Sequence, residues 1–220
     1  ADHKNEYKDY SRNTTSRSPY AMQYMLRLNQ DWRFNADWAW DQDERATRAG
    51  SLMFNYQPED NLNKIINFGY RYKNDGVYFN EDLGRYVTGS GDYVQTLPDG
   101  TKKVYKDFYK VEQTDASIMW PVFQRWNAIA RWQFDYNRSR TLDAFGGFEY
   151  SNCCWKVRLV QRYWIDYDER SMSPDDNRRP DRGIFLQVIL KGLGGVTGNK
   201  VGTFLDEGIP GYQRREQHGY

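Results

Sequence analysis

The sequence predicts an all-β protein, an antiparallel transmembrane β-barrel of which this chain supplies the C-terminal portion, about nine strands. Three observations lead to this fold class. The mean hydropathy is low, −0.96, yet 17% of the 220 residues are aromatic, which contradicts disorder. The longest apolar stretch, residues 184–190, is too short for a membrane-spanning helix. Apolar and polar residues instead alternate, as they do in strands with one lipid-facing and one water-facing side.

The alternation is clearest in residues 31–41 and 125–137, where nearly every even position is apolar and nearly every odd position is polar. A helix would place Trp32 and Trp38 on almost opposite sides and mix carboxylates into the apolar side. Both segments are therefore predicted to be strands. The side chains expected to face lipid are Trp32, Phe34, Trp38, Trp40, Trp126, Trp132 and Phe134.

Weaker alternation extends the pattern along most of the chain. The predicted strands are residues 20–29, 31–41, 48–57, 62–73, 108–120, 125–137, 141–150, 154–165 and 183–191. Short links fall at 29–31, 57–61, 121–124 and 151–153, and longer or more polar links at 42–47, 74–107, 138–140 and 166–182. Outer-membrane barrels have short periplasmic turns and longer extracellular loops, so we expect the short links in the periplasm. Within residues 74–107, the Pro98-Asp99-Gly100 turn signal suggests an additional hairpin.

The positions between the apolar ones carry charges of both signs, which we expect to face a polar lumen. Ion pairs with one another, or contacts with water, are the favoured interpretation of these positions. The near-balance of 31 Lys+Arg and 30 Asp+Glu gives no reason to expect nucleic acid as a partner. The lumen-facing candidates are Arg33, Asp37, Arg71, Asp115, Arg125, Arg131, Asp135, Asp143, Glu149, Lys156, Arg158 and Arg162.

Nine strands do not complete a membrane barrel. An open sheet edge in hydrocarbon leaves backbone groups unpaired, and bacterial single-chain barrels carry even strand numbers. We therefore expect residues 1–191 to be the last strands of a larger barrel. Residues 192–220 are expected to form a Gly-rich periplasmic or lumenal tail; the glycine run at 192–198 lacks phosphate-loop spacing, and we expect no helix after it.

The only two cysteines, Cys153 and Cys154, are adjacent. Neighbours on a strand point to opposite faces, and a ring closed between them is strained. In an oxidising compartment, each is better placed to bond a cysteine elsewhere. A reduced or mutually bonded pair remains the alternative.

Several segments resemble the LptD family of outer-membrane lipopolysaccharide-assembly proteins. Residues 150–159, which contain the adjacent cysteines, resemble the family's Cys-Cys segment, and residues 182–195 resemble its final strand. Shorter matches are residues 204–212 and residues 113–117, which lead to Trp120 and Pro121. The matches lie in family order over about residues 110–212.

This resemblance implies a function without catalysis, cofactor or metal. It implies lipopolysaccharide translocation into the outer leaflet of the bacterial outer membrane through a laterally opening barrel. The implied partners are lipopolysaccharide, the lipid bilayer, an LptE-like lipoprotein plug, an LptA-like periplasmic bridge and the remainder of the chain. It also implies disulfides from Cys153 and Cys154 to cysteines of an N-terminal domain. The implied lateral-gate strand consists of Gly183, Ile184, Phe185, Leu186, Gln187, Val188, Ile189 and Leu190.

Three other kinds of protein share some of these features. A passive porin has the same periodicity but rarely needs cysteines. An outer-membrane enzyme usually needs a well-placed histidine, and the only histidines, His3 and His218, lie in the polar ends of the chain. A soluble β-sandwich accounts less well for strands of eleven or more residues with Trp near their ends.

Overall fold

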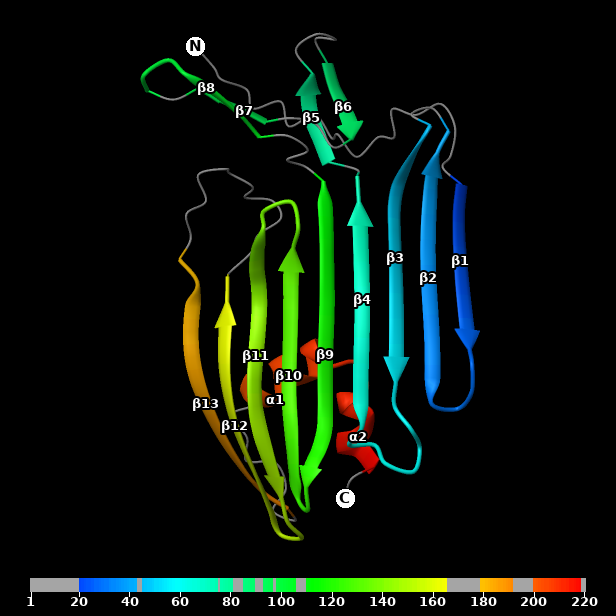
Figure 1. The fold of residues 1–220 in the computed structure, drawn as a ribbon, viewed down its shortest axis with the longest axis vertical. Helices are drawn as coiled ribbons and strands as arrows, with labels where there is room; N and C mark the ends of the chain where they lie inside the picture. The colour runs from blue at the N-terminus through cyan, green and yellow to red at the C-terminus, as the bar shows by residue number, and fades with distance from the viewer. Residues whose placement is uncertain are drawn as a thin grey trace, which may run out of the picture.

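Nine strands form one antiparallel sheet in the computed structural model, which describes residues 20–42, 45–74, 76–80, 85–89, 93–96, 98–105, 110–165, 179–191 and 200–218. The sheet order is β1-β2-β3-β4-β9-β10-β11-β12-β13 (Figure 1). The strands are β1 (Tyr20–Arg27), β2 (Trp32–Asp41), β3 (Ala46–Tyr56), β4 (Ile65–Lys73), β9 (Val111–Phe123), β10 (Trp126–Asp135), β11 (Arg140–Ser151), β12 (Trp155–Trp164) and β13 (Asp181–Leu190). This confirms the predicted fold class and strand number, and the sheet is not closed.

Two small hairpins lie between β4 and β9: β5 (Gly76–Asn80) with β6 (Arg85–Gly89), and β7 (Tyr93–Thr96) with β8 (Lys102–Tyr105). The second hairpin turns at the predicted site, where Gly100 has a φ of +81° and Asp99 accepts a hydrogen bond from the Thr101 hydroxyl. The first hairpin was not predicted. Both lie at the upper end of the sheet in Figure 1, opposite the short β1–β2, β3–β4, β9–β10 and β11–β12 turns.

The register places the predicted lipid-facing residues on one side of the sheet, which we call the aromatic face. Phe34 lies opposite Phe54, with ring centroids 4.7 Å apart, and Trp126 lies opposite Tyr150 at 5.1 Å. Large apolar side chains on this face are exposed: Trp132 is 46% exposed and Leu186 is 66% exposed. All seven residues predicted to face lipid are on this side: Trp32, Phe34, Trp38, Trp40, Trp126, Trp132 and Phe134.

The opposite side, the inner face, carries a small apolar core beneath two helices. Helices α1 (Lys200–Gly208) and α2 (Tyr212–His218) lie against the lower half of the sheet (Figure 1). Neither helix is long or apolar enough to cross a membrane. The core joins one residue from each of five strands to both helices and the segment between them: Ile65, Met119, Ile129, Phe145 and Val160 pack with Val201, Phe204, Leu205, Ile209 and Tyr212.

The expectation of a tail without helices is wrong. Val201, Phe204 and Leu205 stand at the i, i+3, i+4 spacing of an apolar helix stripe, and this stripe is buried in the core. The helix forms because the inner face supplies apolar partners for that stripe. The preceding glycine run lies in residues 192–199, outside the described residues.

Most strand boundaries differ from prediction by one to three residues, and two of these differences move predicted site residues. Arg125, expected on a strand facing the lumen, lies in the β9–β10 turn with a φ of +70° because β9 continues to Phe123. Cys154, expected as the first residue of a strand, lies in the β11–β12 turn with Cys153, so the two thiols are not held on opposite faces.

We expect Gly147→Ala to impair folding of the complete barrel, because a Cβ at this inner-face position would overlap the carbonyl oxygen of Leu159 and lie 2.8 Å from Val160 Cα. Overpacking of this kind costs about 1–3 kcal/mol or more. Gly146→Ala is the matched control, since its Cβ would meet nothing closer than 4.0 Å. Heat-modifiable migration in gels measures the folded fraction, and equal loss in both variants would contradict the close approach of β11 and β12.

Candidate functional site

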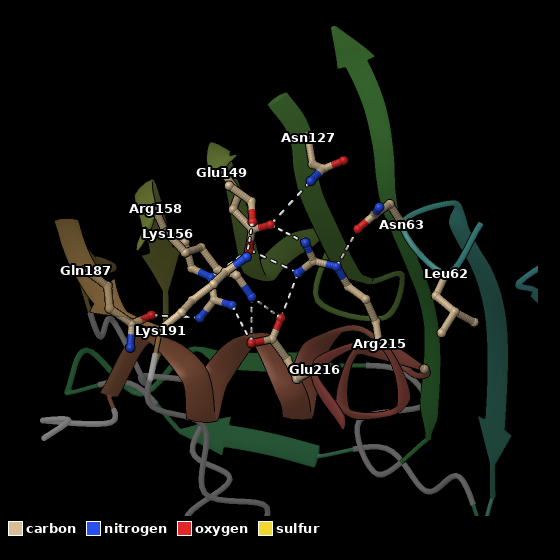
Figure 2. Close-up of polar contacts among 12 residues, drawn as sticks. Leu62, Asn63, Asn127, Glu149, Lys156, Arg158, Gln187, Lys191, Arg215 and Glu216 are labelled. Carbon is tan, nitrogen blue, oxygen red and sulfur yellow. Dashed lines mark hydrogen bonds and ion pairs between the residues drawn. The ribbon is translucent and has the colours of Figure 1, made fainter. Parts of the chain in front are cut away.

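A group of five charged side chains lies together on the inner face, and we call it the Glu149 cluster: Glu149, Lys156, Arg158, Arg215 and Glu216 (Figure 2). The first three come from β11 and β12, and the last two come from α2. In Figure 2 the strand and helix side chains point toward one another. The cluster therefore joins the tail to the sheet.

Glu149 is completely buried, and a buried carboxylate is strongly unfavourable unless it is paired. It accepts a 2.8 Å hydrogen bond from Arg158 Nε and hydrogen bonds from both terminal nitrogens of the Arg215 guanidinium. Asn127 of β10 donates a further hydrogen bond at 3.3 Å. Removing one partner of such a buried pair typically costs about 3–5 kcal/mol, so the position of α2 is coupled to the integrity of the sheet.

Arg158, which is 2% exposed, contacts three separate elements. Its guanidinium donates to Glu149 on β11, to Gln187 Oε1 on β13 and to Glu216 on α2, each at 2.8 Å. Glu216 also accepts hydrogen bonds from Lys156 Nζ at 2.9 and 3.0 Å. The Arg158 side chain on β12 therefore links β11, the last strand β13 and the tail.

Charge neutralisation within the cluster sets the protonation of the helix carboxylate. Burial alone would raise the pKa of Glu216, but the charges of Arg158, Lys156 and Arg215 outweigh burial and hold this pKa below its ordinary value. Glu216 is thus ionised wherever the tail is docked at neutral pH.

A second network lies on the same face, farther from α2 along the strands. Arg131 donates to Asp115 on β9 and to Asp143 on β11, at 2.5 and 2.8 Å, and Arg162 donates to Asp143 at 3.0 Å. Asp135, at the end of β10, is buried and accepts a 2.9 Å hydrogen bond from Arg138.

The structure therefore brings together most of the predicted lumen-facing residues. Asp115, Arg131, Asp135, Asp143, Glu149, Lys156, Arg158 and Arg162 lie in these ion pairs. Arg33, Asp37 and Arg71 lie on the part of the inner face formed by β2–β4, where Asp37 accepts a 2.7 Å hydrogen bond from Ser51. Arg125 is the exception, because it lies in a turn.

The two cysteines form an exposed turn at the end of the sheet near α2. Their Sγ atoms lie 2.8 Å apart, and both thiols are free. The hydrogen bond with Cys153 raises the pKa of the Cys154 thiol above its ordinary value. The residue after β13, Lys191, donates its backbone N–H to the Cys154 carbonyl at 2.8 Å and its Nζ to Ser151 at 3.1 Å. The cysteine turn is thus attached to the end of the last strand.

Strand β13 forms one edge of the sheet and pairs only with β12 among the strands described. Its outward residues Ile184, Leu186, Val188 and Leu190 are exposed, whereas Phe185 and Gln187 point to the inner face. Gly183 lies opposite Arg162, and Ile189 lies opposite Lys156. The last strand therefore offers an unpaired edge and an apolar outer side.

Within the described residues, no three His, Cys, Asp or Glu side chains are grouped in a way that suits a metal ion. Of the two histidines, His218 ends α2, and His3 lies outside the described residues.

The comparisons with known proteins decide the family. A family model described as "LptD: LPS transport system D" matches residues 1–126. The chain belongs to the LptD family. It is 55% identical over 217 residues to an LPS-assembly protein LptD of Ectopseudomonas mendocina, covering 98% of this chain and 23% of that relative. It is 59% identical over 203 residues to an LPS-assembly protein LptD of Pseudomonas syringae pv. syringae, covering 92% of this chain and 22% of that relative.

The chain spans about a quarter of the length of these LptD relatives and corresponds to their C-terminal part. The family is one of transport and assembly rather than of enzymes, and its members are outer-membrane proteins of Gram-negative bacteria. The family and localisation predicted from the sequence are confirmed.

Sequence reasoning missed the residues that the C-terminal tail contributes to the Glu149 cluster. Arg215 and Glu216 lie shortly after Gly211 in a segment read as a polar end of the chain. A usable signal was present, because Tyr212 and Arg215 are three residues apart, on one side of a helix turn. Glu149 and Arg158 on the sheet also needed buried partners.

We expect the tail to detach on acidification. Because the folded pKa of Glu216 is lowered, its carboxylate stabilises the docked tail above the unfolded value of about 4.3, and this stabilisation is lost as the pH falls through the folded pKa. Hydrogen exchange of residues 200–218 in the whole protein, corrected for intrinsic rates, should show protection that is lost only at a pH below the unfolded value. Glu216→Gln should remove this step, and an unchanged acid transition in that variant would contradict the assignment.

Proposed function

We propose that this chain is the part of an outer-membrane barrel that carries one side of a lateral seam, through which lipopolysaccharide enters the outer leaflet. The observation that carries the proposal is one unclosed sheet of nine strands with an aromatic face, an ion-paired inner face and a free edge at β13. The LPS-assembly names of the relatives support the cargo.

The aromatic face suits contact with acyl chains. In hydrocarbon every polar hydrogen needs a partner within the protein, since no water is present to supply one. The indole N–H groups of Trp38 and Trp132 each donate to a threonine hydroxyl on the adjacent strand, Thr47 at 3.2 Å and Thr141 at 3.1 Å. This repeated arrangement leaves both indoles satisfied on a lipid-facing surface.

The inner face suits a polar lumen. Lipopolysaccharide is an amphiphile whose phosphates and sugars cannot cross hydrocarbon and whose acyl chains avoid water. A lumen lined by ion pairs such as Arg131–Asp115 beside a separable edge lets the sugars stay hydrated while the acyl chains move into lipid. The strand that faces β13 would belong to the upstream part of the protein. An LptE-like plug and an LptA-like bridge would complete the route.

The cysteine turn suits disulfides to an N-terminal periplasmic domain. Cys153 and Cys154 are exposed at the sheet end with the short turns, which in outer-membrane barrels is the periplasmic end. A domain on that side would reach both thiols.

Depletion of the full-length protein tests the proposed function against a passive porin. We expect loss of newly made lipopolysaccharide from the cell surface, with little change in uptake of small hydrophilic solutes. Surface lipopolysaccharide is measured by accessibility to an outer-membrane modifying enzyme, and solute uptake by a periplasmic reporter. Loss of solute uptake with normal surface lipopolysaccharide would favour the porin.

Non-reducing electrophoresis of the full-length protein tests the disulfides. We expect a mobility shift that persists in Cys153→Ser and in Cys154→Ser and vanishes only in the double variant, because each cysteine has its own partner. Reduction before loading is the control. Absence of a shift in the unmodified protein would remove the disulfide assignment.

A further inference from the structure

The C-terminal tail lies across the lower half of the inner face. Its contacts with the sheet extend from β4 and the β3–β4 turn to β13. At one end it meets β4 and the β3–β4 turn. Gln57 Nε2 donates to the Gly211 carbonyl at 3.0 Å, and Asn67 Nδ2 donates to the Pro210 carbonyl at 3.1 Å. Arg215 Nε donates to Asn63 at 2.6 Å. Side chains of β4 and the β3–β4 turn therefore anchor this end of the tail through hydrogen bonds to two backbone carbonyls and one guanidinium group.

At the other end the tail contacts the last strand. The Phe204 ring of α1 lies 5.5 Å from the Phe185 ring of β13 and 5.5 Å from the Phe145 ring of β11. Arg158 holds Gln187 of β13 and Glu216 of α2 with the same guanidinium. Both inward side chains in the middle of β13 are therefore in contact with the tail or with a residue that binds it.

The seat for the tail is shaped closely around two glycines. A Cβ at Gly208 would lie 2.9 Å from Phe145 and 3.0 Å from Arg131 Cδ. Gly211 has a φ of +94°, which residues with a side chain rarely adopt. A Cβ added at this position would lie 2.7 Å from Gln57 Oε1. A methyl group at either position requires the tail or the sheet to shift.

These contacts matter because β13 is an edge strand. Among the described strands it pairs with β12 alone, so a single backbone ladder secures it to the sheet. Side-chain contacts from the inner face add a second, independent attachment. The same attachment reaches the cysteine turn, since Lys191 at the end of β13 is bonded to Cys154 and Ser151.

We propose that residues 200–218 are an internal brace that fixes β13 and the cysteine turn to the sheet from the lumen side, so that the seam opens by displacement of the strand facing β13. This inference rests on the proposed function for the existence of a seam. The brace itself consists only of contacts within this chain.

Hydrogen exchange of the full-length protein in nanodiscs tests the brace. The first variant is Gly211→Ala, which adds a methyl group without changing charge; the second is Glu216→Gln, which keeps the side-chain shape and removes its charge. The matched control is Glu59→Gln, because Glu59 pairs with Arg214 of α2 at 3.3 Å but both side chains are exposed. The segments compared are residues 181–190 and, as an internal reference, residues 32–41 of β2, which contribute nothing to the core beneath the helices.

We expect exchange in residues 181–190 to become about tenfold faster in Gly211→Ala and in Glu216→Gln, while residues 32–41 change less than about twofold. Glu59→Gln should match the unmodified protein in both segments. Unchanged exchange of residues 181–190 in both brace variants would overturn the proposal. Equal acceleration of both segments would also overturn it, because the tail would then support the whole sheet rather than its last strand.

Failure of the brace and failure of the proposed function give different results. If exchange in residues 181–190 does not respond while surface lipopolysaccharide depends on the protein, the brace is wrong and the transport function stands. If depletion leaves surface lipopolysaccharide unchanged, the transport function is wrong whatever the exchange data show.

Discussion

The pairing of buried Glu149 with Arg158 and Arg215 is the interaction on which the inner face depends. A fully buried carboxylate needs opposite charges close by, and here one arginine comes from the neighbouring strand and the other from the tail. Because Arg215 is on α2, the sheet cannot satisfy Glu149 completely without docking the tail. Arg158 extends the same requirement to Gln187, and so to the last strand. The charge of one residue thus connects four elements of secondary structure.

The two sides of the sheet share one backbone but differ in their side chains, which are mostly apolar on one face and mostly polar or charged on the other. On the aromatic face, apolar side chains remain exposed, and the indoles of Trp38 and Trp132 are satisfied by threonines of the same face. On the inner face, charges pair with one another and with charges of α2, and Ile129 and Val160 build an apolar core beneath the helices. Strand alternation keeps these environments apart because successive side chains point to opposite sides. A shift of one residue in register would place charges in the aromatic face and is strongly disfavoured.

Alternation also explains how much could be predicted from the sequence. Period two is a local property, so the nine strands and the facing of residues such as Trp38 and Arg131 follow from it. The helices could not be predicted by the same test, since the stripe around Phe204 is short and gains stability only from partners on five distant strands. The cysteine turn was misplaced by one residue because turn geometry, and not alternation, ends β11. The Glu149 cluster was half predicted: its strand members were identified, and its helix members were not.

The separation of the tail from its partners along the chain determines when its contacts can form. Gln57 and Asn63 bind residues 154 and 152 positions later, and Asn67 binds Pro210 across 143 positions. Contacts at such separations form only after the intervening chain has been organised, because closing a long loop costs entropy that a single hydrogen bond does not offset. Arg158 and Glu149 are adjacent only when β11 and β12 are in register. Docking of α2 therefore requires a sheet already paired from β4 to β13, so the brace can act on the last strand only once that strand is in place.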